Sequence, residues 1–341
     1  MLILVIGATG AQGRPVISSL LRPQDDGSPS PYSVRALTRD PNNEHARLLA
    51  SWGVELFKGQ IEDAKSIAAA LEGCHGVFVN IDTFSVGTQT EIYTGIKLFE
   101  QAHRAGIKHF IWSGLDYASK LGGFDPKYDQ AVHYHAKAIV GQYLQLQPSS
   151  PSGDSLTWSI LSTGPYLENL RGPLLGPLPE KENGAVVWSL PLGDGRFPAI
   201  SVEDIGWWAR YMFDHRAETS GQELKVASEM MNIDQLVETF TRVTGIPAIY
   251  KRISIEEHLA KNPARCSKPV VKAQPNGYTI GEAYRGLYGI WGGGLLTRDM
   301  EWIRRTHPTG YTLESFIKQK GIDGSRDGDF TLLKDSHLHR E

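Results

Sequence analysis

The chain has 341 residues, of which 40% are hydrophobic and 21% are charged, and its formal net charge is −3. This composition is typical of a globular protein with room for one large α/β unit or for two domains. The negative net charge and the absence of any cluster of five or more Lys and Arg residues both argue against a nucleic-acid-binding surface. Two cysteines cannot form a disulfide framework, and no group of Cys and His has metal-ligand spacing.

The apolar N-terminal segment MLILVI is too short for the core of a signal peptide and runs straight into glycines. No stretch approaches the ~20 apolar residues that a membrane-spanning helix needs. We therefore expect a cytoplasmic protein that does not insert into membranes and does not bind nucleic acid directly.

The first half of the chain alternates between short apolar runs and helical patterns. Strands are expected over 2–7, 32–37, 53–59, 76–81, 108–114 and 156–163. Helices are expected over 11–22, 41–52, 62–72, 88–105 and 131–146. This alternation predicts an α/β fold with a doubly wound parallel sheet, and the near-continuous apolar character of the strands indicates that helices cover both of its faces.

The later half is richer in Gly and Pro and mixes short strands with helices. The strands are expected over 185–190 and 248–253, and the helices over 202–215, 232–245 and 312–321. We expect residues 1–163 to form the sheet domain, and 164–323 to form a smaller α+β lobe interleaved with the last sheet strands. The polar insertion 22–33 is expected to be a surface loop, and the tail 324–341 to be poorly ordered.

A glycine motif follows the first strand directly. In VIGATGAQGRPVI, the glycines Gly7, Gly10 and Gly13 stand three residues apart and open a helical pattern. Glycine allows a tight strand-to-helix turn and leaves backbone N–H groups open to a pyrophosphate, which the N-terminus of the helix then stabilises. Because the motif begins an alternating α/β half, it predicts dinucleotide binding rather than a purely structural turn.

The end of the second strand indicates which dinucleotide binds. Arg39 follows the strand, and a guanidinium there suits the 2′-phosphate of NADP. Asp40 is the alternative, as an NAD-type acid, but its position before Pro41 predicts that it caps the next helix. Arg35 lies within the strand and is less well placed. NADP(H) is therefore favoured over NAD.

Three segments together carry a resemblance to a known family: GATGAQG after the first strand, ALTRDP after the second, and HYHAKAIVGQYL on a later helix. With KGQIED (58–63) and TGPYLEN (163–169), they make the chain resemble the NmrA-like family of atypical short-chain dehydrogenases/reductases, relatives of the isoflavone-reductase-like enzymes. The resemblance extends from Leu2 to about Gly321. It implies a Rossmann domain that binds NADP(H) and a small lobe at the nicotinamide end.

The resemblance also implies a set of cofactor-binding residues. The pyrophosphate would be bound by Gly7, Thr9, Gly10, Gln12 and Gly13. The 2′-phosphate would face Arg39, the adenine would lie by Gln60 and Ile61, and the rest of the cofactor would lie by Asn80, Lys137, Tyr166 and Asn169.

The residues for catalysis depart from the usual pattern. Ordinary short-chain dehydrogenases carry Tyr-x-x-x-Lys on one helix, whose spacing places both side chains on one face. Here the residue four before Lys137 is His133, and Tyr134 is rotated off that face. Lys137 is a candidate proton relay or ribose anchor, and His133 a candidate acid/base because its ordinary pKa lies near neutrality. The alternative is that Lys137 only anchors the cofactor and His133 is a polar helix residue.

Further candidates follow the fifth strand. Ser113 lies where dehydrogenases place a hydroxyl that orients the substrate, and Tyr117 is a possible replacement for the missing tyrosine. Asp116 is expected to be a solvated loop residue. Four aromatic residues are candidate walls of a substrate pocket: Tyr166, Trp188, Tyr284 and Trp291.

Two functions remain open from these residues. The first is an NADP(H)-dependent reductase that transfers hydride to a small organic substrate of aromatic or conjugated type. The second is a non-catalytic NADP(H) sensor that acts through a protein partner. The retained lysine favours the reductase, and the missing tyrosine favours the sensor.

Overall fold

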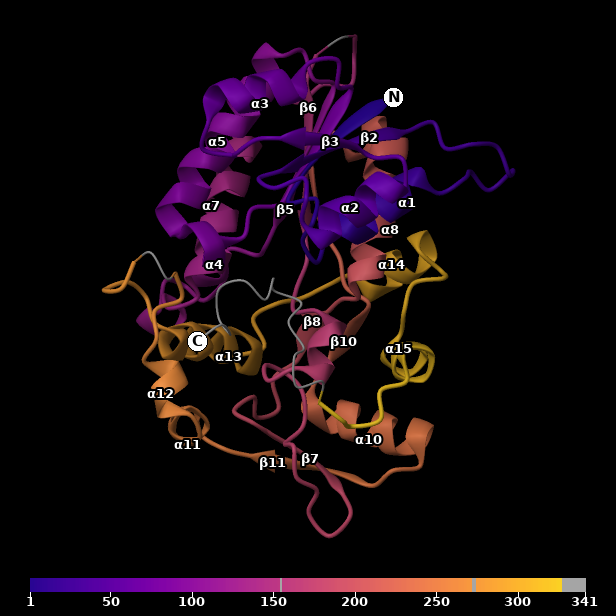
Figure 1. Cartoon of the computed structure of the whole chain (residues 1–341). Coiled ribbons are helices and arrows are strands. Elements are labelled where there is room, and N and C mark those ends of the chain that lie inside the picture. The colour runs from indigo at the N-terminus through magenta and orange to yellow at the C-terminus, as the bar shows by residue number, and fades with distance from the viewer. Residues whose placement is uncertain (154, 272–273, 327–341) are drawn as a thin grey trace. The chain divides into compact units, whose positions relative to one another are not determined.

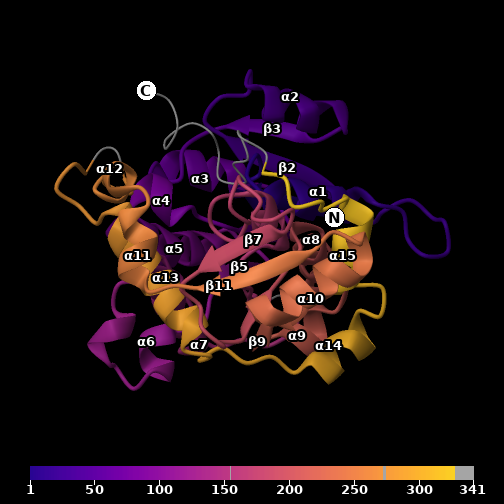
Figure 2. The same ribbon diagram turned by 90° about the horizontal axis from the view of Figure 1, so that it is seen from below.

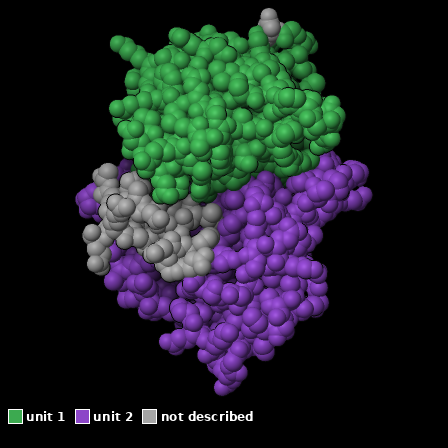
Figure 3. All heavy atoms as spheres, turned by 45° about the vertical axis from the view of Figure 1, so that its right-hand side comes forward, with its two compact units in different colours: residues 1–115, 136–162, 205–224 green, residues 116–135, 163–204, 225–341 purple. Residues whose placement is uncertain are grey.

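The computed structural model describes residues 1–153, 155–271 and 274–326. By its internal contacts the chain divides into two compact units, coloured separately in Figure 3. Unit 1 comprises residues 1–115, 136–162 and 205–224, and unit 2 comprises 116–135, 163–204 and 225–341. Both units are discontinuous, because the chain passes from one to the other five times. Most of the tail 324–341, for which we expected poor order, lies outside the described residues.

Unit 1 is built on a seven-stranded sheet with the order β3-β2-β1-β4-β5-β6-β9. Its strands are β1 (Leu2–Ile6), β2 (Ser33–Thr38), β3 (Glu55–Lys58), β4 (Gly76–Val79), β5 (His109–Gly114), β6 (Thr157–Ser162) and β9 (Gln222–Lys225). The pairs from β3 through to β6 are all parallel. The order reverses at β1, which pairs with β2 on one side and with β4 on the other.

Helices cover both faces of this sheet (Figure 1). They are α1 (Gly13–Leu21), α2 (Glu44–Ser51), α3 (Ala64–Leu71), α4 (Thr83–Val86), α5 (Thr88–Arg104), α7 (Val132–Gln145), α8 (Val202–Asp214) and α9 (Arg216–Thr219). On one face, Gln101 of α5 donates to the Ala64 carbonyl at the start of α3 at 2.8 Å. On the other, Arg210 of α8 donates to the Ser19 carbonyl of α1 at 2.9 Å. The predicted α/β doubly wound fold is confirmed.

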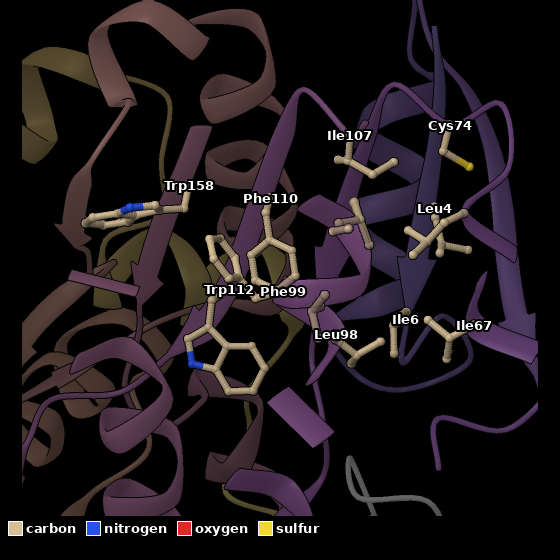
Figure 4. Packing of buried hydrophobic residues seen from close by; sticks show 14 of the residues in the cluster. Leu4, Ile6, Ile67, Cys74, Leu98, Phe99, Ile107, Phe110, Trp112 and Trp158 are labelled. Carbon is tan, nitrogen blue, oxygen red and sulfur yellow. The ribbon is translucent and has the colours of Figure 1, made fainter. Parts of the chain in front are cut away.

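The apolar runs of the sequence form the core between the sheet and α3, α5 and α7 (Figure 4). Phe99 and Phe110 pack edge to face with ring centroids 5.3 Å apart. Trp112 on β5 and Trp158 on β6 are almost fully buried beside them. Truncation of a buried ring of this size costs about 3–5 kcal/mol of unfolding free energy, so this cluster is a major source of the stability of unit 1.

Unit 2 contains short strands and helices. Its elements are α6 (Ala118–Leu121), the 3₁₀ helices η1 (Pro126–Tyr128) and η2 (Leu167–Arg171), β7 (Val186–Leu190), β8 (Phe197–Ala199), β10 (Glu229–Met231), α10 (Ile233–Thr244), β11 (Ala248–Arg252), α11 (Ile255–Ala260), α12 (Pro263–Cys266), α13 (Ile280–Gly292), α14 (Met300–Thr306) and α15 (Leu313–Lys320). Strands β7 and β11 form a parallel pair with α10 beside β11 (Figure 2). Strands β8 and β10 form an antiparallel pair.

One local prediction is wrong. Helix α2 begins at Glu44, and its cap is Asn43, whose side chain accepts from the Ala46 N–H at 2.9 Å. Asp40 instead accepts from the Asn42 N–H at 2.9 Å and closes a turn before the helix. Three neighbouring residues can each cap, and the sequence does not distinguish them, because Asp and Asn are both good caps.

Candidate functional site

The glycine motif forms the turn from β1 into α1, and its three glycines meet different demands. Gly7 has a φ of +79°, and a Cβ there would lie 2.4 Å from the Asn80 carbonyl oxygen. A Cβ on Gly13 would lie 2.2 Å from the Gly7 oxygen and 2.6 Å from the Ala8 Cα. A Cβ on Gly10 would meet only the Gly7 oxygen, at 3.2 Å.

This division of roles matches what a pyrophosphate cradle needs. In such cradles the first glycine makes the tight turn, the second leaves the backbone open to the pyrophosphate, and the third allows close packing of the helix. In this chain Gly7 and Gly13 are required by the fold itself, whereas Gly10 is partly exposed and a Cβ there would meet a single atom, the Gly7 oxygen. The residues present therefore fit the pyrophosphate of a dinucleotide.

The turn also lies at the reversal of the strand order. In open α/β sheets, ligands bind at the carboxyl ends of the strands where that order reverses. Here those ends belong to β1 and β4, and Asn80, the residue after β4, donates its N–H to the Ile6 carbonyl at 3.2 Å. The predicted residues Gly7 and Asn80 are thus direct neighbours.

Lys137 on α7 belongs to unit 1 and is largely enclosed, with 8% of its surface exposed. Its Nζ donates to the Ile81 carbonyl at 2.8 Å and to Asn80 Oδ1 at 3.2 Å, and it lies 3.4 Å from the Ser113 carbonyl. The ammonium also lies 5.4 Å from the centroid of the Trp112 ring, whose Nε1 donates to the Lys137 carbonyl at 3.0 Å. The cation is therefore held at the carboxyl ends of β4 and β5.

A buried carboxylate completes this group. Glu91 on α5 has no exposed surface, and its Oε1 lies 2.9 Å from Lys137 Nζ. Its other oxygen accepts from the Thr83 hydroxyl. Burial raises the pKa of the Glu91 carboxyl, while the Lys137 charge and the Thr83 hydroxyl oppose that rise. The sequence reasoning missed Glu91; its signal is a charged residue at helical spacing from the buried positions Thr94, Gly95 and Leu98 on α5.

Ser113 at the end of β5 connects this group back to the glycine turn. Its hydroxyl donates to Gln12 Oε1 at 2.6 Å, and both side chains are buried. Gln12 is the residue before α1 and Gly13. The five predicted residues Gly7, Gln12, Asn80, Ser113 and Lys137 are therefore brought together within unit 1, linked by direct contacts.

The predicted adenosine end lies at the neighbouring strands. Arg39 is exposed directly after β2, and the Gly59 N–H donates to the Thr38 carbonyl at 3.0 Å, so the ends of β2 and β3 are side by side. Gln60 is exposed and Ile61 half-buried in the turn after β3. Arg35 points elsewhere, because its guanidinium bonds Glu55 and the carbonyls of α3. Thr9, in the glycine turn, is buried.

The other catalytic candidates belong to unit 2. His133, in the first turn of α7, is 8% exposed and its ring lies 4.9 Å from that of Tyr134. Tyr117, before α6, is half-buried, with its ring 6.1 Å from His135. His135 is hydrogen-bonded in turn to the Ser119 hydroxyl. Burial lowers the pKa of His135, so this ring is neutral at neutral pH.

Tyr166 and Asn169 lie at the 3₁₀ helix η2 in unit 2, and both are half-buried. Between them, Glu168 accepts from the Ser201 hydroxyl at 3.0 Å and from the Val202 N–H at 3.1 Å. Glu168 therefore caps the start of α8, and burial raises its pKa to about 7.

The prediction that Asp116 is solvated is wrong. Its side chain is 1% exposed and forms a two-pronged pair with Arg298, at 2.7 and 3.2 Å. Lys225 Nζ lies 3.2 Å from the same carboxylate. Arg298 also donates to the Thr163 and Val226 carbonyls, so the pair connects distant segments of unit 2.

Two of the four predicted pocket walls are also wrong. Trp188 has no exposed surface and donates its Nε1 to the Leu175 carbonyl at 3.0 Å. Trp291 is 2% exposed and donates to the Tyr134 hydroxyl at 3.0 Å. Both are core residues of unit 2 with satisfied ring nitrogens, whereas Tyr166 and Tyr284 are half-buried.

Comparison with known proteins decides the family. Residues 1–274 match the sequence profile of the NmrA-like family. The chain belongs to the NmrA-like family. An NmrA-like family domain-containing oxidoreductase of Cladobotryum, FrzB, is 30% identical over 270 residues, which cover 74% of this chain and 76% of that protein.

Solved structures show the same fold. NmrA, a negative transcriptional regulator crystallised with NADP, matches with a TM-score of 0.71 and 20% identity, over 95% of this chain and 96% of that one. The triphenylmethane reductase of Citrobacter, crystallised with NADP(H), matches with a TM-score of 0.67 and 17% identity, over 94% and 99% of the two chains. No helix among the described residues of this NmrA-like protein has the length and apolarity to cross a membrane.

Proposed function

We propose that this NmrA-like protein is an NADP(H)-dependent reductase that transfers hydride to a small organic substrate. The observation that carries this proposal is the glycine turn. Gly7 and Gly13 are needed by the chain's own packing, while Gly10 leaves a backbone face open where the order of the strands reverses. The oxidoreductase relative that covers three quarters of the chain supports the same class.

The predicted residues divide between the cofactor and the substrate in this proposal. Arg39 grips the 2′-phosphate, Gln60 and Ile61 lie by the adenine, and the backbone around Gly10 binds the pyrophosphate. Asn80 and Lys137 hold the nicotinamide end. The bound nicotinamide supplies the hydride, and Ser113, His133 and Tyr117 are the candidates for orienting the substrate or moving its proton.

We propose an aromatic or conjugated acceptor, such as an enone, a quinone or an imine. The partly exposed rings of Tyr166 and Tyr284 support this class, whereas Trp188 and Trp291 are core residues.

The test is a turnover assay with the purified full chain. NADPH absorbance is followed in the presence of a panel of enones, quinones, imines and ketones, beside a Lys137→Met variant. We expect oxidation of NADPH with at least one acceptor and loss of turnover in the variant. Tight NADPH binding without turnover on any acceptor would refute the reductase.

The second candidate is an NADP(H) sensor that acts through a protein partner. A specific observation favours it: the Lys137 ammonium, which carries three protons, already has Glu91, Asn80 and the Ile81 carbonyl as acceptors within the protein. His133 also stands where the reactive tyrosine of ordinary dehydrogenases is placed. Binding without turnover, together with NADPH-dependent capture of a partner, would favour the sensor.

A further inference from the structure

The pair of Glu91 and Lys137 is not explained by packing alone. Glu91 has no exposed surface, although a carboxylate is costly to bury and most helices keep such groups on the solvent face. Both of its oxygens are satisfied, one by Lys137 and the other by Thr83. A buried pair of this kind adds little stability over apolar residues of the same volume, so stability alone does not account for it.

We propose that Glu91 is a positioning residue that keeps Lys137 a permanent cation at the carboxyl ends of β4 and β5. In this role Lys137 binds and orients the cofactor as a fixed charge and does not relay protons. This inference rests on the proposed function only in taking the cofactor as the ligand of the Lys137 cation. The inference itself concerns the charge state and the position of Lys137.

The geometry determines how Glu91 acts. The three uncharged acceptors of Nζ lie on strand ends: Asn80 and Ile81 follow β4, and Ser113 is on β5. Glu91 reaches Nζ from α5 and supplies the only negative charge in direct contact with it among the described residues. The ammonium is therefore held by the Glu91 carboxylate together with the uncharged oxygens of Asn80, Ile81 and Ser113.

Charge balance explains why the carboxylate is needed. Burial disfavours the charged form of a lysine, and a contacting carboxylate restores it. Without Glu91, the contacts of Lys137 Nζ would be the Trp112 ring and uncharged acceptors. The further charge near the pair is Asp82, at the start of α4, which acts on Glu91 through space.

Exchange of one contact allows the cofactor to bind. The longest contact of Nζ is the one to the Ser113 carbonyl, at 3.4 Å, followed by Asn80 at 3.2 Å. A ribose hydroxyl can replace either of them while the Glu91 and Ile81 contacts, at 2.9 and 2.8 Å, hold the cation in place. The two short contacts thus position Nζ and the two longer ones leave room for a ligand.

The test compares Glu91→Gln with Glu100→Gln. Glutamine keeps the shape of Glu91 and removes its charge. Glu100 lies on the same helix, and its carboxylate accepts from the Tyr143 hydroxyl at 2.7 Å, away from Lys137. The first readout is the Lys137 ¹⁵Nζ signal, assigned with Lys137→Met and followed from pH 6 to 11 in the full chain without cofactor.

We expect the Lys137 ¹⁵Nζ signal to change from the ammonium to the amine form at a lower pH in Glu91→Gln than in the wild type, and to be unchanged in Glu100→Gln. The second readout is the Kd of NADPH against pH. We expect Glu91→Gln to bind nearly as well as the wild type at low pH and about tenfold or more weakly once Lys137 loses its proton. The wild type and Glu100→Gln lack this pH step.

A double variant separates positioning from general damage. If Glu91 acts through Lys137, Glu91→Gln/Lys137→Met binds NADPH as Lys137→Met does, with no further loss. If the double variant instead loses NADPH affinity by the product of the two single-variant fold-losses, the proposal is wrong. It is also wrong if Lys137 titrates identically in Glu91→Gln and in the wild type. If Glu91→Gln does not fold, Glu91→Asp, whose shorter side chain draws the carboxylate away from Lys137 Nζ, must move both readouts in the same direction by a smaller amount. A wild type that fails to bind NADPH would refute the proposed function and leave the NMR result to decide this inference.

Discussion

The three glycines of the β1–α1 turn allow a test in which two similar substitutions have opposite effects. Gly13→Ala places a methyl 2.2 Å from the Gly7 oxygen and 2.6 Å from the Ala8 Cα and oxygen, and backbone atoms cannot rotate away as side chains can. Overpacking of this kind costs about 1–3 kcal/mol, and fixed backbone neighbours place this site at the upper end. We expect the Tm to fall by about 3–5 °C.

Gly10→Ala should do the reverse. Its methyl would meet only the Gly7 oxygen, at 3.2 Å, which requires a shift of a few tenths of an ångström. The Tm should therefore stay within about 2 °C of the wild type. On the open face, the same methyl stands between the backbone and the pyrophosphate. Loss of one or two hydrogen bonds to a charged phosphate, each worth about 1.5–3 kcal/mol, weakens NADPH binding at least about tenfold.

The assay measures both quantities on each variant: the Tm by differential scanning fluorimetry without cofactor, and the Kd by quenching of tryptophan fluorescence on titration with NADPH. We expect Gly10→Ala to be stable but to bind NADPH poorly, and Gly13→Ala to be destabilised. If Gly10→Ala binds NADPH like the wild type, the open backbone face is not where the pyrophosphate lies. If Gly13→Ala keeps the wild-type Tm, the close contacts around α1 do not constrain the fold.

Three further outcomes follow from other residues. Arg39→Ala should weaken NADPH about tenfold or more and leave NADH nearly unchanged, and equal losses for both cofactors in titrations would contradict the assignment of the 2′-phosphate. Burial lowers the pKa of His109 to about 3. The His109 ring therefore stays unprotonated in the folded chain, whereas in the unfolded chain it gains a proton as the pH falls below about 6.5. Its contribution to the free energy of unfolding is therefore complete above that pH and falls by about 1.4 kcal/mol per pH unit below it. Urea titrations should show that His109→Gln loses less unfolding free energy between pH 7.5 and pH 5.5 than the wild type does. An identical loss in the two proteins would exclude His109 as the source. Asp116→Asn leaves Arg298 buried without its counter-charge and should cost about 3–5 kcal/mol in urea unfolding, whereas a loss under about 1 kcal/mol would show that the pair is dispensable.

The local pattern of the sequence predicted the sheet and the turn because both depend on residues close together in the chain. The apolar runs at 2–7 and 76–81 correspond to β1 and β4, and the glycine spacing sits between β1 and α1 as expected. Strand β9 escaped prediction, since QELK is polar apart from Leu224 and its place in the sheet depends on its partner β6, about sixty residues earlier.

The site was predictable only in part for the same reason. Lys137 and Asn80 were found from motifs, but their contact and the role of Glu91 depend on α5 and α7 packing against β4 and β5. Asp116 looked like a loop residue because its partner Arg298 lies 182 positions away. Pairings of this range leave no periodic signal, so a single sequence cannot reveal them.

The repeated passage of the chain between its two units has a consequence during synthesis. Domains usually fold as they emerge, beginning with the N-terminal one. The sheet of unit 1 lacks its last strand until Lys225 has left the ribosome, and residues 116–135 of unit 2 wait for partners that begin at 163 and resume at 225. The nascent chain must therefore carry an open β6 edge and an unpartnered segment through much of its translation. A ribosome-stalled chain ending near residue 200 should accordingly be protease-sensitive in both units.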